Sequence, residues 1–168
     1  MLPLLTMIIV QCTNDPDEHL YCLEEAEMFA FKDVGIAGGE SRTYKCFEKL
    51  SKHVSKKYMD SIFISKKASL ITRAYAFWYL SKETESGDLL NLLKENLLHY
   101  EAVRVKSLDI NYETTFSDLL IDIALKYLNK EDSSTLKKYV LSCELTRLNH
   151  YDSWSNREKL YPGKMYQL

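Results

Sequence analysis

The chain has 168 residues, of which 46% are apolar and 27% are charged, and its formal net charge is −2. These proportions are typical of a globular domain and exclude an intrinsically disordered chain. Four cysteines are too few for a disulfide scaffold, and no apolar run reaches the roughly 18–20 residues that a membrane-spanning helix needs.

The first eleven residues are mostly apolar and uncharged, and Cys12 and an acidic segment follow them. Such a profile is typical of a secretory signal. Residues 9–12 (IVQC) resemble a bacterial lipobox, whose cysteine is acylated and becomes the first residue. We therefore expect residues 1–11 to be a signal segment and Cys12 to be lipidated, with the protein anchored in a bacterial cell envelope by lipid alone. The alternative is a buried N-terminal strand or helix in a cytoplasmic protein.

Residues 12–40 form an acidic lead-in, with eight acidic residues against the single Lys32. Three glycines near its end interrupt its pattern, so we expect it to be only partly ordered. Of the remaining cysteines, a Cys22–Cys46 bridge is one option in an oxidising envelope, but the sequence leaves the pairing open. The cysteines form no CxxC motif and the four histidines are scattered, so we predict no metal site and no cofactor.

Residues 41–150 are predicted to be a helical domain, followed by an irregular tail over 151–168. Apolar residues recur there at helical spacing. We expect six helices, which start near Ser41, Ser55, Ala68, Asp88, Phe116 and Ser133 or Ser134. Residues 102–114 have no helical period and form either a long loop or one short hairpin. Because short turns join neighbouring helices, the pattern predicts an all-α fold of stacked antiparallel helical hairpins, with irregular N- and C-terminal segments.

Two stretches resemble HEAT-like helical repeats: Tyr44-x-x-Phe47-x-x-Leu50 and residues 69–80 (SLITRAYAFWYL). In these repeats an arginine near the start of the second helix precedes an aromatic or alanine-rich face. The second stretch is also similar to the R-x-Y-x-F-W-x-L helix of a group of small bacterial envelope lipoproteins. The resemblance covers roughly residues 41–125. It implies a fragment of a HEAT-like α-solenoid with an envelope address, and it supplies no catalytic residue.

Residues 41–82 hold ten lysines and arginines against two acidic residues. Such a block either binds an acidic partner or is a solvated face that the acidic lead-in partly neutralises. An acidic protein is the favoured partner, ahead of nucleic acid, because the spacing of the interleaved aromatic residues is that of a core. The candidate partner-binding residues are Lys49, Lys52, Lys56, Lys57, Lys66, Lys67 and Arg73. Arg73 has an alternative role inside the protein, because its helix is apolar nearly all round.

We therefore expect a non-catalytic protein-binding module, and an immunity-type protein that blocks a toxin is one concrete form. A second class is a small helical hydrolase or nuclease that uses Asp118, Asp122 and His150. Against it, Asp118 complements the dipole of its helix and Asp122 is spaced to pair with Lys126. A third class is a cytosolic, regulatory module that binds nucleic acid, which applies if residues 1–11 are not a signal.

Overall fold

The computed structural model describes residues 15–34, 39–97, 101–108 and 110–142. Cys12, the expected signal segment, His150 and the tail over 151–168 lie outside these ranges. The described elements follow in the order α1 (Pro16–Glu24), β1 (Phe29–Val34), β2 (Gly39–Glu40), α2 (Arg42–Ser51), α3 (Lys56–Ile64), α4 (Leu70–Glu83), α5 (Ser86–Glu95), β3 (Ala102–Leu108), β4 (Ile110–Thr115), α6 (Phe116–Ala124) and α7 (Lys130–Ser142).

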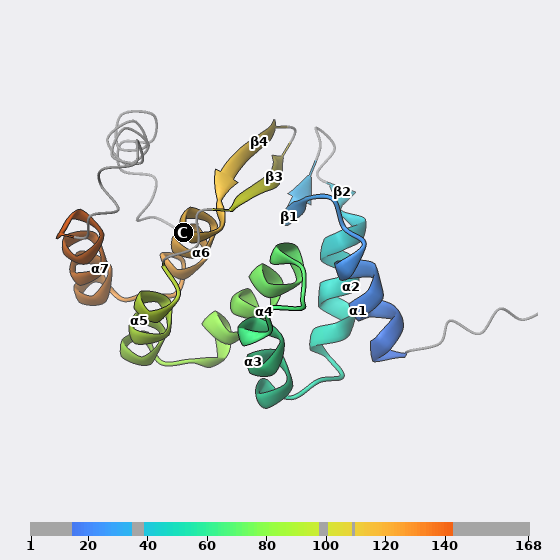
Figure 1. The fold of residues 1–168 in the computed structure, drawn as a ribbon, viewed down its shortest axis with the longest axis horizontal. Coiled ribbons are helices and arrows are strands. Elements are labelled where there is room, and N and C mark those ends of the chain that lie inside the picture. Colours follow the sequence, from blue (N-terminus) through green and yellow to red (C-terminus); the bar gives the residue numbers. More distant parts are fainter. Residues whose placement is uncertain (1–14, 35–38, 98–100, 109, 143–168) are drawn as a thin grey trace, which may run out of the picture.

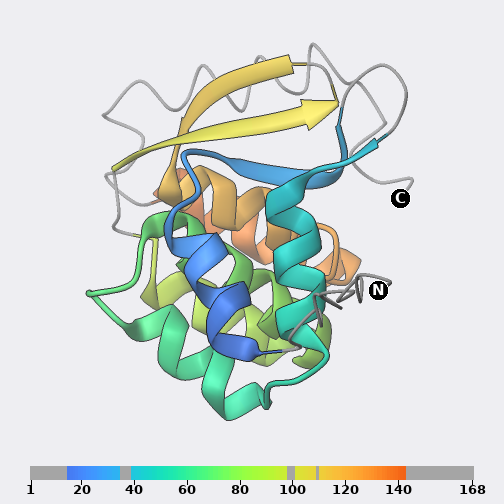
Figure 2. The same ribbon diagram turned by 90° about the vertical axis from the view of Figure 1, so that its right-hand side faces the viewer.

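The prediction of an all-α fold is wrong, because the protein is a mixed α/β fold with a four-stranded sheet. The strand order is β2-β1-β3-β4, in which β1 runs parallel to β3 and the other pairs are antiparallel. The described helices gather on one face of this sheet (Figures 1 and 2). A sheet covered by helices replaces the expected stack of helical hairpins.

The six predicted helices are confirmed as α2 to α7, and three of their starts have the expected capping side chains. The Ser41 Oγ accepts a hydrogen bond from the Tyr44 amide at 2.9 Å, and the Ser55 Oγ accepts one from the Tyr58 amide at 3.2 Å. The Thr115 Oγ1 does the same for the Asp118 amide at 3.1 Å. These side chains satisfy backbone donors that have no partner within the helix.

The sheet arises from two segments that the helical pattern did not cover. Residues 102–115 form the hairpin alternative, and β3 alternates between exposed positions and the buried Val103 and Val105. In the acidic lead-in, α1 and β1 are ordered, and Phe29 of β1 is buried opposite Val105 of β3. Because these strands are far apart in the sequence, no periodic pattern within either segment predicts that they pair.

The core centres on α4, in which every residue from Ile71 to Trp78 is buried. A helix that is buried all round must be covered by neighbours on every side. The helices α3, α6 and α1 and the strand β1 pack against it. Six rings from three elements form what we call the aromatic cluster: Phe29 and Phe31 of β1, Tyr44 and Phe47 of α2, and Tyr75 and Trp78 of α4.

The hydroxyl of Tyr75 ties β1 to α4. It donates to the Ala30 carbonyl at 2.7 Å and accepts from the Ala30 amide at 3.2 Å. β2 pairs with β1 only at Asp33 and Val34, so Ala30 has no strand neighbour on that side. Buried backbone groups need partners, and the phenol supplies both at once. Burial is also the main reason that the pKa of Tyr75 lies far above its ordinary value.

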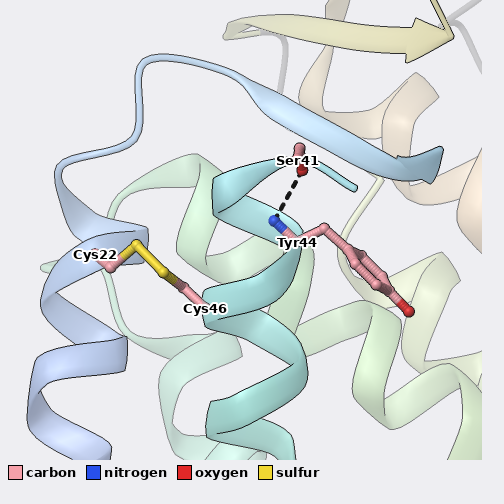
Figure 3. Close-up of a disulfide and its surroundings, with 4 residues drawn as sticks. All are labelled: Cys22, Ser41, Tyr44 and Cys46. Atoms are coloured by element: carbon pink, nitrogen blue, oxygen red, sulfur yellow. Dashed lines mark hydrogen bonds between the residues drawn. A yellow bond between two sulfur atoms is a disulfide. The ribbon is translucent and has the colours of Figure 1, made fainter. Parts of the chain in front are cut away.

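A disulfide between Cys22 and Cys46 joins α1 to α2, with the two Cα atoms 6.2 Å apart (Figure 3). The bridge that the sequence left open is thus present. It forms because α1 packs along α2, which brings two half-buried cysteines together. α1 is held at a second point as well, because the Glu24 Oε2 accepts a hydrogen bond from the Ser69 amide at 2.9 Å, just before α4.

Candidate partner-binding surface

All six predicted lysines are exposed, and they lie at the two ends of α3. The first group, which we call the junction lysines, surrounds the connection between α2 and α3 and comprises Lys49, Lys52, Lys56 and Lys57. This connection lies at the end of α2 remote from the sheet (Figures 1 and 2). Lys66 and Lys67 follow the last turn of α3. α3 has nine residues and is therefore about 13 Å long, so the structure separates the two groups.

Two of the junction lysines contact other parts of the protein. The Lys52 Nζ lies 3.8 Å from the Glu48 Oε1 on the same helix. The Lys56 Nζ donates to the Glu83 carbonyl at 3.0 Å, where a cation complements the C-terminal end of α4. Lys49 and Lys57, like Lys66 and Lys67, form no ion pair with any described residue. Their ammonium groups are therefore available to an external anion.

Arg73 lies apart from these lysines, inside the protein, with only 7% of its surface exposed. Its Nε donates to the Phe63 carbonyl at 2.9 Å, and its guanidinium carbon lies 5.0 Å from the centre of the Phe116 ring. Burial lowers the pKa of Arg73, while the charge of Glu101 opposes that shift. The arginine thus links α3, α4 and α6, which is the internal role that the sequence left open.

Two further lysines, which the sequence reasoning missed, lie over rings of the aromatic cluster, and a third lies near one of them. The Lys82 Nζ lies 5.4 Å from the centre of the Phe47 ring and 5.1 Å from that of Trp78. The Lys126 Nζ lies 4.0 Å from the centre of the Phe31 ring and 5.8 Å from that of Trp78. We call these two the ring-facing lysines. The third, Lys32 of β1, lies close enough to Lys82 for its charge to lower the pKa of Lys82.

Only one of these three had a local signal. Lys82 follows Trp78 by four residues on α4, so a helical reading already places both on one face. The packing of α6 brings Lys126 to the cluster, and the position of β1 brings Lys32 near Lys82, and no local pattern predicts either arrangement. The segment after α6 is fixed there by a further contact, because the Trp78 Nε1 donates to the Tyr127 hydroxyl at 2.7 Å.

The carboxylates of the enzymatic alternative have structural partners. Asp118 is buried in the first turn of α6, and its Oδ2 accepts a hydrogen bond from the Thr115 Oγ1 at 3.0 Å. The charge of Asp122 acts on Lys126, as the spacing suggested. Within the described ranges, no group of three or more His, Cys, Asp or Glu side chains is placed to hold a metal ion. None of the helices in the same ranges is long and apolar enough to cross a membrane.

No protein-family model and no curated protein matches this sequence. The geometry and charge of the surface are therefore the clues to its function.

Proposed function

We propose that the chain is a non-catalytic module that binds an acidic protein through the exposed lysines around α3, in an oxidising compartment outside the cytoplasm. The observation that carries this proposal is the exposure of six lysines within one stretch of chain, four of which form neither an ion pair nor a side-chain hydrogen bond with a described residue. Uncompensated surface charge of one sign steers an oppositely charged partner and speeds its association.

The Cys22–Cys46 disulfide supports the oxidising address. Disulfides persist in secreted and periplasmic proteins and are rare in the cytosol, where thiols are kept reduced. This address fits a lipid on Cys12, which lies only three residues before Asp15, the first described residue. The expected envelope address favours one concrete form of this proposal. In that form the protein has the predicted immunity-type role, and its acidic partner is a toxin.

Charge reversal tests the binding. Wild-type protein and a variant with all four junction lysines changed to Glu are immobilised and exposed to an extracytoplasmic extract of the source cell. The matched control carries Lys130→Glu and Lys138→Glu, two exposed positions on α7, which lies on the far side of the molecule from α2 (Figure 1). We expect an acidic protein that wild type and control retain, that the variant loses, and that added salt releases. Equal retention by the variant contradicts the proposal.

The address is tested separately, by the intact mass of the protein from membrane and soluble fractions of the source cell. A species that starts at Cys12 with added acyl mass and an intact disulfide is expected in the membrane fraction. An unmodified, full-length and reduced chain in the cytosol contradicts the address and makes nucleic acid the next partner to test.

A further inference from the structure

The ring-facing lysines share an unusual environment, because their ammonium groups lie over aromatic faces rather than beside carboxylates. Neither Lys82 nor Lys126 forms an ion pair with a described residue. Glu48 and Glu83 act on Lys82, and Asp122 acts on Lys126, only through the longer-range field. For both lysines, burial is the main cause that lowers the pKa, so these charges have lost part of their hydration without gaining a close counter-ion.

The surroundings of Lys82 add to this imbalance. Lys32 of β1 repels Lys82. The Lys32 Nζ lies 4.0 Å from the Glu40 Oε1, and both of these side chains are exposed to solvent. A carboxylate that approaches Lys32 and Lys82 together would relieve the repulsion and restore the lost solvation. Phe47 and Trp78 are buried beneath Lys82, and they offer apolar contact to the carbon atoms of such a ligand once the ammonium group is drawn away.

The same place is continuous with the junction lysines. Glu48 lies between Lys52, with which it forms an ion pair, and Lys82, on which its charge acts. The Glu83 carbonyl, which binds the Lys56 ammonium, belongs to the residue next to Lys82. A path of cations therefore runs from the α2–α3 connection along the end of α4 to β1 and the segment after α6. Lys66 and Lys67, at the other end of α3, lie off this path.

We propose that the centre of the partner-binding surface is the pair Lys82 and Lys126 above Trp78, and that it binds an acidic peptide segment whose carboxylates draw the two ammonium groups off the rings. This inference rests on the proposed function and narrows it to one site and one ligand chemistry. Interfaces concentrate their binding free energy in a few central residues, of which tryptophan is among the most frequent. Lys66 and Lys67 then contribute little.

Methionine is the informative substitution, because it retains most of the apolar stem over the rings and removes the charge. The test variant carries Lys82→Met and Lys126→Met, and the matched control carries Lys66→Met and Lys67→Met. All proteins carry Trp154→Phe, which leaves Trp78 as the only tryptophan of the two in the chain. A synthetic oligoglutamate peptide is titrated at low salt while the emission of Trp78 is followed, and urea denaturation confirms that each variant is folded.

We expect the peptide to change the emission of Trp78, and the dissociation constant to rise about tenfold in the test variant but to stay within about twofold in the control. Equal affinity of wild type and test variant overturns the inference. Two results would then leave the proposed function standing without Lys82 and Lys126 at its centre. One is a loss of affinity in the Lys66→Met, Lys67→Met control, and the other is a loss of capture of the acidic protein when the junction lysines are reversed.

The reference protein, which carries only Trp154→Phe, is also titrated with phosphatidylglycerol vesicles and with duplex DNA. A response to the vesicles or to DNA in the absence of any response to oligoglutamate overturns the choice of an acidic peptide. If oligoglutamate leaves the emission unchanged and the junction lysines also prove dispensable for capture, both the centre and the proposed function fall.

Discussion

Replacing Tyr75 with Phe removes one oxygen atom and leaves two buried backbone groups without a partner. Tyr75 and Ala30 are both buried, and the hydroxyl bonds both the amide and the carbonyl of Ala30. An unsatisfied buried donor or acceptor costs about 1–3 kcal/mol, while removal of the phenol hydroxyl recovers part of that cost. We therefore expect Tyr75→Phe to lower the free energy of unfolding by about 2–4 kcal/mol.

Urea denaturation followed by tryptophan emission measures this change, and the slope of the unfolding free energy against urea should stay constant. Tyr79→Phe is the matched control, because Tyr79 lies on the same helix, is half-buried and makes no hydrogen bond to a described residue. We expect the control to remain within about 0.5 kcal/mol of wild type. A loss in Tyr75→Phe no greater than in the control would refute the argument that this hydroxyl replaces a missing strand neighbour of β1.

The other predictions concern the disulfide, Arg73, alkaline pH and the hairpin turn. Removing the bridge by changing Cys22 and Cys46 to Ser should cost about 3.5 kcal/mol, from a sequence separation of 24 residues, and reductant should leave this variant unaffected while it destabilises wild type. Arg73→Met should cost about 1–3 kcal/mol in urea denaturation and leave the affinity of the folded protein for oligoglutamate unchanged; a selective loss of affinity would assign Arg73 to the partner instead. Because burial raises the pKa of Tyr75 above its ordinary value of 10.0, the folded protein keeps a proton that the unfolded chain loses. The protonated Tyr75 therefore contributes to stability in full below pH 10, and this contribution is lost as pH rises further. The unfolding free energy should fall more steeply above pH 10 in wild type than in Tyr75→Phe. Leu108 has a φ of 53°, so Leu108→Asn should raise the unfolding free energy by about 0.5–1 kcal/mol, and a decrease would mean that the exposed leucine side chain stabilises the turn.

Local signals in the sequence were sufficient for the helices α2 to α7, but they predicted neither α1 nor the sheet. Ser41 and Ser55 predicted helix starts correctly, because a cap acts on amides two or three residues away, and the start near Phe116 is capped by Thr115. The strand β1 was missed because Phe29 and its neighbours carry mixed signals, and their stability depends on β3, more than seventy residues later in the chain. Without β1, the hairpin at 102–115 had no sheet to join, and the helices alone implied an all-α stack.

The same distinction between near and distant contacts explains the candidate surface. The charge of residues 41–82 predicted exposed lysines around α3, since most charged side chains on helices face solvent. The charge alone did not show that Lys66 and Lys67 lie apart from the junction lysines in space. The two groups are close in sequence, but α3 lies between them. The charge pattern also omitted Lys126, which lies far along the chain and reaches Trp78 only through the packing of α6 against α4.

The Tyr75 hydroxyl and the disulfide hold different elements in place. Tyr75 fixes β1, and β1 carries both Phe31, which lies under Lys126, and Lys32, which repels Lys82. The disulfide instead fixes α1 to the outer side of α2, while Phe47 on α2 is held independently by stacking on Tyr75 and Trp78. The aromatic cluster includes no residue of α1, whereas two of its six rings lie on β1. The disulfide therefore joins two helices outside the aromatic cluster's own contacts, and the hydroxyl of Tyr75 helps to position the β1 rings beneath the ring-facing lysines.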